Sequence, residues 1–162
     1  MKTTHIICID PAFRKNGFGV IILDVAAKTV TVQKIKDFAA FLKWALERYE
    51  YSNALWAVEN SNLQQLYYAS KYGRNLTQAM NVGKNLGLSQ CVCDYLEFLN
   101  CRLVQVSPKA KGKAFSMEIA QLDAKASGWV LPKLNGDELA AYKLLSLVYG
   151  RRDKFQGGEI LK

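Results

Sequence analysis

Short apolar runs separated by turn signals dominate the first part of the chain, and they predict three β-strands. The runs cover residues 4–10, 18–24 and 29–35. The first run ends at Asp10-Pro11, where proline stops a strand, and Asn16-Gly17 before the second run is a tight-turn signal. Polar and apolar residues alternate in the third run, as in a half-exposed antiparallel strand. The strands therefore form a meander with Asp10 at the mouth of its first hairpin.

After the meander, apolar residues at helical spacing alternate with two more strand-like runs. Asp37 is the expected N-cap of the first helix. The expected elements are a helix over 38–49, a strand over 55–59, a helix over 77–99, a strand over 102–106, and helices over 114–126 and 135–149. This order is that of an α/β ribonuclease H-like fold, a five-stranded mixed sheet of three antiparallel and two parallel strands flanked by helices.

Two carboxylates end strands that such a fold makes neighbours. Asp10 ends the first strand, and Glu59 ends the fourth. A right-handed crossover through the intervening helix places these two strands side by side, so both carboxylates meet at one edge of the sheet. Asp10 alone is typical of a turn before proline. The second acid in the same position is what indicates a site.

Length and composition indicate a single soluble domain. The chain has 162 residues, enough for one domain with a full core. Its apolar runs are shorter than the roughly 18 residues of a membrane span, and the N-terminus leads directly into a strand, so a cytoplasmic protein is expected. We assign residues 1–150 to the domain and residues 151–162 to a basic, flexible C-terminal tail.

The charge balance favours a polyanionic partner. Lysine and arginine number 22 against 14 acidic residues, for a net charge of +8. Each phosphate that a basic protein contacts releases condensed counterions, so nucleic acid is the first candidate. Charge alone is weak support, because many small basic proteins bind no nucleic acid.

Two segments are candidates for contacts with nucleic acid. Between 60 and 81, tyrosines are interleaved with basic residues, which is typical of stacking on unpaired bases and also of tyrosines that pack at the edge of a core. The sequence leaves open whether this segment is a helix or a loop. The run from Lys109 to Lys113 is either a solvated turn or a clamp on phosphates.

Several motifs in chain order resemble the RuvC family of Holliday junction resolvases. They are Ile-Asp-Pro at 9–11, Gly-Phe-Gly-Val-Ile at 17–21, Ala-Val-Glu-Asn at 57–60, Val-Gly-Lys-Asn-Leu-Gly at 82–87, Val-Ser-Pro-Lys at 106–109 and Asp-Glu-Leu-Ala-Ala-Tyr at 137–142. The resemblance implies a homodimeric, Mg²⁺-dependent endonuclease that cuts branched DNA at four-way junctions by paired incisions, in recombination and repair. Gly83 and Gly87 would allow two long helices to approach closely in such a dimer.

The resemblance also implies roles for individual residues. Asp10 and Glu59 correspond to the first catalytic aspartate and the glutamate of the family, and Asp137 to the first of two aspartates on its last helix. Ala140 stands where the second aspartate is expected. Glu138 or Asp123 is then the alternative fourth ligand, unless three acids suffice. Asp137 and Glu138 are also explained as acids in the first turn of a helix.

The implied site is a carboxylate centre surrounded by DNA contacts. Two Mg²⁺ ions, with Mn²⁺ as the alternative metal, would activate water and stabilise the leaving oxygen. The expected catalytic residues are Asp10, Glu59, Asp137 and Lys111. The expected metal ligands are Asp10, Glu59, Asp137 and Glu138. The expected DNA contacts are Arg14, Lys15, Tyr67, Tyr68, Lys71, Tyr72, Arg74, Lys109, Lys111 and Lys113.

Two rival functions fit the same residues. One is another nuclease of the ribonuclease H-like fold, such as the RuvX-like group, acting on RNA or on other branched DNA. The other is a DNA-binding module of this fold that has lost its activity, in which case Ala140 would reflect the loss of one catalytic acid. Retention of both Asp10 and Glu59 favours a nuclease.

Overall fold

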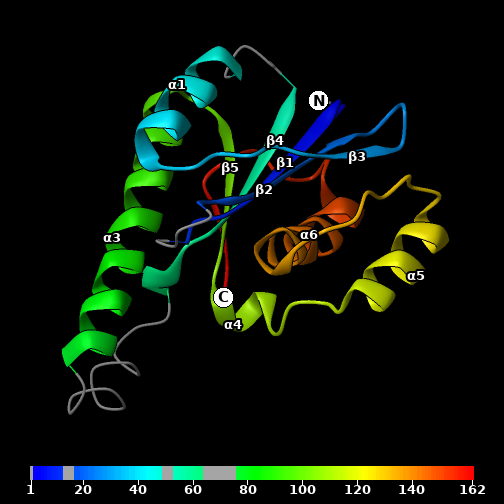
Figure 1. Ribbon diagram of the computed structural model, residues 1–162. Coiled ribbons are helices and arrows are strands. Elements are labelled where there is room, and N and C mark those ends of the chain that lie inside the picture. The colour runs from blue at the N-terminus through cyan, green and yellow to red at the C-terminus, as the bar shows by residue number, and fades with distance from the viewer. Residues whose placement is uncertain (1, 13–16, 49–52, 64–75) are drawn as a thin grey trace.

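The computed structural model describes residues 2–12, 17–48, 53–63 and 76–162, which form one mixed sheet with helices on both faces (Figure 1). The strands are β1 (His5–Asp10), β2 (Gly19–Asp24), β3 (Thr29–Val32), β4 (Ala54–Glu59), β5 (Arg102–Val106) and β6 (Glu159–Leu161). The helices are α1 (Phe38–Arg48), η1 (Ser61–Leu63), α3 (Leu76–Phe98), α4 (Pro108–Lys111), α5 (Met117–Ser127), α6 (Gly136–Val148) and η2 (Tyr149–Arg151).

The sheet has the order β3-β2-β1-β4-β5-β6. β1, β2 and β3 are antiparallel neighbours, whereas β4 runs parallel to β1, β5 to β4 and β6 to β5. The prediction of a mixed sheet with β4 beside β1 is therefore confirmed.

The prediction of five strands is wrong, because a sixth strand pairs with β5. It comes from the segment that we assigned to a tail, and its three residues are too few to show a period in the sequence. Gly158 donates its backbone N–H to the carbonyl of Leu103 just before β6 begins, which aligns the strand with β5. The domain boundary placed at residue 150 remains a prediction.

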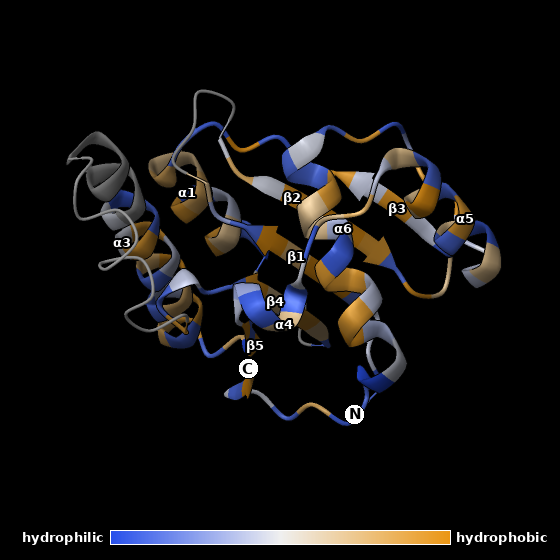
Figure 2. Cartoon of the chain, turned by 90° about the horizontal axis from the view of Figure 1, so that it is seen from below, coloured by the Kyte–Doolittle hydropathy of each residue, from blue (hydrophilic) through white to orange (hydrophobic). Residues whose placement is uncertain are grey.

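Each face of the sheet is covered by its own hydrophobic core. Ile7 and Ile9 pack toward α1 and α3, where Phe41, Trp44 and Leu96 are buried with them. On the opposite face a second core forms against α5 and α6. Its members from the two central strands are Ile6, Cys8, Leu55 and Ala57. Figure 2 shows the apolar colouring of the central strands between these two helical layers. Side chains alternate along a strand, so the core that one residue faces also determines which face of the sheet the next residues of that strand point to.

The helix boundaries follow local capping. The carboxylate of Asp37 accepts a hydrogen bond of 2.7 Å from the backbone N–H of Ala40, which confirms the predicted N-cap of α1. Ser116 caps α5 by accepting from the N–H of Ile119, so that helix begins at Met117 and not at the predicted residue 114. In the part of the chain that the structure describes, every helix is too short or too polar to span a bilayer.

The long helix α3 carries small residues on an exposed side. A Cβ atom added to Gly83 or Gly87 would meet no other described atom within 4 Å. Within this chain the two glycines therefore do not serve a close contact with the sheet. Cys91, one turn further along, is exposed as well.

Candidate active site

The carboxylates of Asp10 and Glu59 lie at the same edge of the sheet, as predicted. The parallel register of β1 and β4 pairs Ile9 with Val58, so the two acids follow at the next position of each strand. By the alternation of side chains, Asp10 extends to the face of Ile6 and Cys8, the face that α6 covers. Glu59 extends to the same face. Neighbouring strands are about 4.8 Å apart, which brings two negative charges together at the edge of an apolar core.

Lys111 supplies the positive charge between them. Its Nζ atom lies 3.2 Å from Oδ2 of Asp10 and forms a second ion pair with Oε2 of Glu59. The three side chains are only 10 to 16% exposed. Asp10, Glu59 and Lys111, far apart in the sequence, therefore form one nearly buried charged cluster.

Burial and charge both change the ionisation of this cluster. Burial raises the pKa of Glu59, the nearby Asp10 raises it further, and Lys111 opposes both effects. Burial alone would lower the pKa of Lys111, but the two carboxylates outweigh burial and raise it. The lysine is therefore held as a cation, and the carboxylates favour any cation placed between them.

A short helix aims Lys111 into the cluster. Ser107 caps α4 by accepting from the N–H of Ala110 at 3.0 Å, and Pro108 occupies the first helical turn, where its missing N–H is not needed. The backbone N–H of Ser107 donates to the carbonyl of Leu161, so β6 also holds the start of this helix. Lys109 and Lys113 are exposed. The segment is thus part helix, and Lys111 is turned inward, whereas a solvated turn or an open clamp would leave all three lysines outside.

The N-terminus of α6 packs against the strand next to Asp10. A Cβ atom on Gly19 would lie 2.1 Å from the carbonyl oxygen of Asp137, so only glycine permits this contact. Gly19 is also the direct partner of Asp10 across the β1–β2 pair. The geometry therefore places the backbone of Asp137 beside the strand that carries Asp10.

Glu138 closes the N-terminus of α6. Its Oε2 atom accepts a hydrogen bond of 2.7 Å from the N–H of Asn135, and Asn135 in turn accepts from the N–H groups of Asp137 and Glu138. This is a complete capping box. The carboxylate of Glu138 is committed to the cap, and the helix start leaves Asp137 as the acid nearer Gly19.

The other candidate for a fourth acidic ligand has a structural partner. Asp123 accepts a hydrogen bond of 2.8 Å from the hydroxyl of Tyr142, which links α5 to α6. Ala140 is buried, with 7% of its surface exposed. The assignment of Glu138 as a metal ligand remains a prediction.

The residues present suit a hard divalent cation without forming a complete set of ligands. Among the described residues, no group of three or more histidine, cysteine, aspartate or glutamate side chains could hold a metal ion. Two carboxylates nevertheless converge on one cation, the Lys111 ammonium. Oε2 of Glu59 is buried, and its charge partner is the Lys111 ammonium. Magnesium prefers carboxylate oxygens and completes its shell with water or substrate, so the pair fits it.

Comparison with known proteins finds a solved structure with a similar fold. No protein-family model and no curated protein matches this sequence. Among solved structures, the chain is similar to T. thermophilus RuvC in complex with a Holliday junction substrate, with a TM-score of 0.53 over 87% of this chain and 89% of the RuvC chain. The fold is RuvC-like. At 15% sequence identity the likeness carries the arrangement of strands and helices and does not extend to individual residues.

Many of the residues expected to contact DNA lie outside the described residues. The residues concerned are Arg14, Lys15, Tyr67, Tyr68, Lys71, Tyr72 and Arg74, which lie in 13–16 and 64–75. Of the three lysines expected near the scissile phosphate, Lys109 and Lys113 are exposed and Lys111 is in the charged cluster. Among the expected site residues that the structure describes, Asp10, Glu59 and Lys111 form one cluster of ion pairs.

A buried polar network behind Glu59 was not foreseen from the sequence. Asn60 is 1% exposed, and its amide donates to the side chains of Gln105 at 2.7 Å and Gln90 at 3.3 Å. Its oxygen accepts from the backbone N–H of Asn62. The network ties the end of β4 to β5 and α3, and thereby fixes the backbone that carries Glu59. Only the polar residue directly after an apolar strand hinted at it.

We expect Lys111→Met to destabilise the protein by about 2 kcal/mol at pH 7. Removing one partner of a buried ion pair leaves its acids uncompensated, and partial contact with solvent moderates the usual 3–5 kcal/mol. The folded-state pKa of Glu59 would then lie still further above the unfolded value. The folded variant takes up protons before the unfolded chain as the pH falls, so its deficit should shrink toward about pH 4.5. Urea unfolding of both proteins from pH 4.5 to 8 measures this, and a deficit independent of pH would contradict it.

Proposed function

We propose that the protein is a Mg²⁺-dependent endonuclease that resolves four-way DNA junctions. The observation that carries the proposal is the pair of carboxylates, Asp10 and Glu59, at the ends of adjacent parallel strands with the buried Lys111 ammonium between them. Two nearly buried acids that converge on a cation are costly to the fold, and charged groups of this kind cluster at functional sites. Hydrolysis of a phosphodiester is the chemistry that such a centre supports in a strongly basic protein.

The proposed ligands are Asp10, Glu59 and Asp137. A bound Mg²⁺ pair would lower the pKa of the attacking water and stabilise the leaving oxygen. The chain itself contributes three things: Asp10 and Glu59 fix the ligand oxygens on rigid strands, the apolar core beneath them limits water, and α6 presents Asp137 from the neighbouring helix. Glu138 serves the cap in this proposal.

Lys111 has a separate role in this proposal. Metal ions between the carboxylates would compete with its ammonium for the same oxygens, and the flexible lysine side chain can move toward a phosphate. There it would stabilise the negative charge that develops on the phosphate oxygens during attack. Lys109 and Lys113, both exposed, would contact neighbouring phosphates.

Branched DNA is the proposed substrate on two grounds. The net charge of +8 favours a polyanion, and the structurally similar RuvC was solved with a Holliday junction. Cleavage of a synthetic four-way junction, beside linear duplex DNA and a DNA·RNA hybrid of the same sequence, tests the choice. Selective cutting of the hybrid would favour the RuvX-like alternative, and binding without cutting would favour a non-catalytic module.

We further propose a homodimer with α3 at its interface. Paired incision of a junction needs two active sites related by a two-fold axis. The exposed side of α3 presents Gly83, Gly87 and Cys91, and further along the helix Phe98 is 78% exposed. A second copy packed there would cover this side and use the open space above the glycines.

The proposed dimer predicts that a large side chain at Gly87 prevents two copies from associating. We expect the wild type to sediment at twice 18.2 kDa at micromolar concentration, and Gly87→Arg to sediment as a monomer. Gly150→Arg is the matched control, because it adds the same side chain to another glycine with open space around it. A wild type that is monomeric while it cuts junctions, or a Gly87→Arg variant that remains dimeric, would exclude this interface.

A further inference from the structure

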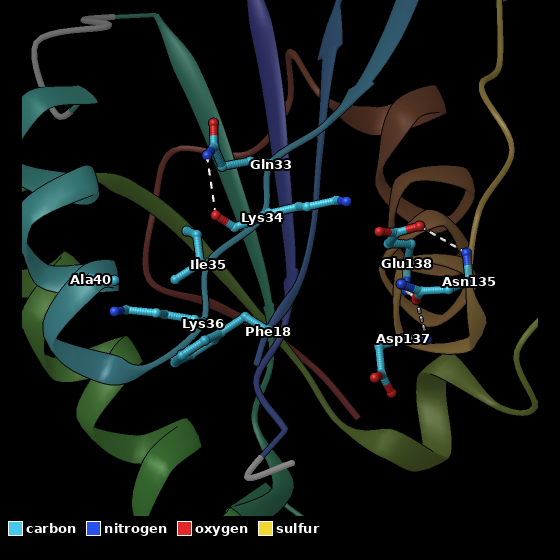
Figure 3. Close-up of a pocket in the computed structure, with 9 residues that line it drawn as sticks. All are labelled: Phe18, Gln33, Lys34, Ile35, Lys36, Ala40, Asn135, Asp137 and Glu138. Atoms are coloured by element: carbon cyan, nitrogen blue, oxygen red, sulfur yellow. Dashed lines mark hydrogen bonds between the residues drawn. The ribbon is translucent and has the colours of Figure 1, made fainter. Parts of the chain in front are cut away.

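A string of three hollows runs along the β3 side of the fold and passes Asp137, a proposed metal ligand. The central hollow, of about 550 Å³, lies between the segment after β3 and the start of α6, and Asp137 lines it (Figure 3). A second hollow of about 200 Å³ shares Phe18 and Lys36 with it and reaches Leu88 on α3. A third, of about 640 Å³, shares Lys34 with the first and continues to Lys133. The shared residues make them neighbours along one path.

At least one exposed lysine lines each of the three hollows. Lys34, Lys36 and Lys133 are exposed, and none of them forms an ion pair with any described residue. Figure 3 shows Lys34 and Lys36 extending in opposite directions from one segment, Lys34 toward α6 and Lys36 toward α1. Ile35 between them is buried in the core, which holds the segment in place. The two lysines therefore flank the central hollow, and neither forms an ion pair with the acids that line it.

Two of the acids that line the hollows cap helix N-termini. Asp37 accepts from the N–H of Ala40 in the first turn of α1, and Glu138 accepts within the capping box of α6. The N-terminus of a helix carries about half a positive charge, which offsets a capping carboxylate. The remaining acid is Asp137, a proposed metal ligand. Three lysines and three acids line the hollows, so the partial charges of the two helix N-termini leave a modest positive surface, with Asp137 in its central hollow.

We propose that this path, the lysine track, binds the phosphate backbone of one DNA arm beside the cutting site. This proposal rests on the proposed function, because the direction of the DNA arm along the track has meaning only if Asp137 marks the place where the DNA is cut. Phosphates fit the track through charge complementarity, and exposed lysines contact them as point charges without reading sequence. The arm enters past Lys133, lies along Lys34 and Lys36, and reaches the carboxylates with its scissile phosphate.

The test compares two triple variants that lose the same charge. Lys34→Ala/Lys36→Ala/Lys133→Ala removes the track, and Lys43→Ala/Lys125→Ala/Lys154→Ala removes three exposed lysines that line none of the three hollows. Binding of a labelled four-way junction and a linear duplex is measured by fluorescence anisotropy in EDTA between 50 and 200 mM salt. Circular dichroism melting verifies that both variants fold.

The track predicts a lower salt slope for one variant only. Each lost phosphate contact reduces the slope of log K against log salt by about 0.9, so the track variant should lose about 2.7 and bind at least roughly tenfold more weakly at low salt. The control should lose far less. Equal slopes for the two variants would overturn the track, even if the wild type cuts junctions normally. A reduced slope on DNA with no cutting of any substrate by the wild type would instead support the track and refute the nuclease, and absence of DNA binding by the wild type would overturn both.

Discussion

Asp10→Asn is expected to lose cleavage of a four-way DNA junction in Mg²⁺ by about three orders of magnitude, while it still binds the junction. Metal assistance is worth several kcal/mol at the transition state, and each 1.4 kcal/mol is tenfold in rate. Asparagine keeps the shape of the side chain at the end of β1 but removes the charge that holds the cation. Glu59→Gln at the end of β4 should behave in the same way.

Binding should survive because the two acids contribute nothing attractive to DNA. Both carboxylates carry negative charge, and removing one reduces repulsion of the phosphates. Lys111 would keep one of its two ion pairs in either variant. Single-turnover cleavage and anisotropy in Ca²⁺ separate the two properties.

The control is Glu47→Gln, at an exposed position of α1, which covers the opposite face of the sheet from the two acids. It makes the same chemical change and should cut at the wild-type rate. Near-normal cleavage by Asp10→Asn, or parallel losses of cleavage and binding, would remove Asp10 from the role of metal ligand.

Gly19→Ala is expected to destabilise the fold by about 3 kcal/mol and to reduce cleavage even where the protein is folded. The added Cβ atom would overlap the carbonyl oxygen and carbon of Asp137, at 2.1 and 2.5 Å. Both clashing groups are backbone, so relief requires a shift of α6 against β2, and overpacking of this kind costs up to 3 kcal/mol or more. The melting temperature should fall by about 6 °C or more for a chain of this size.

Gly136→Ala is the matched control at the first position of α6. A Cβ atom there meets nothing within 4 Å among the described residues, and alanine favours the helix, so the melting temperature should be unchanged or slightly higher. Equal stability of the two variants would mean that α6 does not rest on Gly19. The contact would then have no part in placing Asp137.

The strand-end acids could be predicted because each lies in a strong local pattern. Apolar runs that end in Asp10 and Glu59 predict strands, and the handedness of the crossover predicts that the strands are neighbours. The register of β1 and β4 confirms this adjacency. Neither step needs knowledge of distant contacts.

Other parts depend on contacts that no local pattern encodes. Lys111 appears in the sequence as one of several lysines in a basic run, and only the turn of α4 decides that it alone is buried. β6 is three residues long and exists because β5 offers an edge. Lys34 and Lys36 flank the buried Ile35, a local pattern that indicates exposure of both lysines, but the hollow beside them requires α6 on the other side.

Strand-resolved cleavage of an immobile four-way junction by the wild type tests the central claim most directly. Each of the four strands carries its own label, and products are followed with Mg²⁺ and with EDTA. The account predicts Mg²⁺-dependent incisions in two opposite strands at symmetric positions, with linear duplex and DNA·RNA hybrid left largely uncut. Cutting that persists in EDTA, or that treats linear duplex and junction alike, would contradict it.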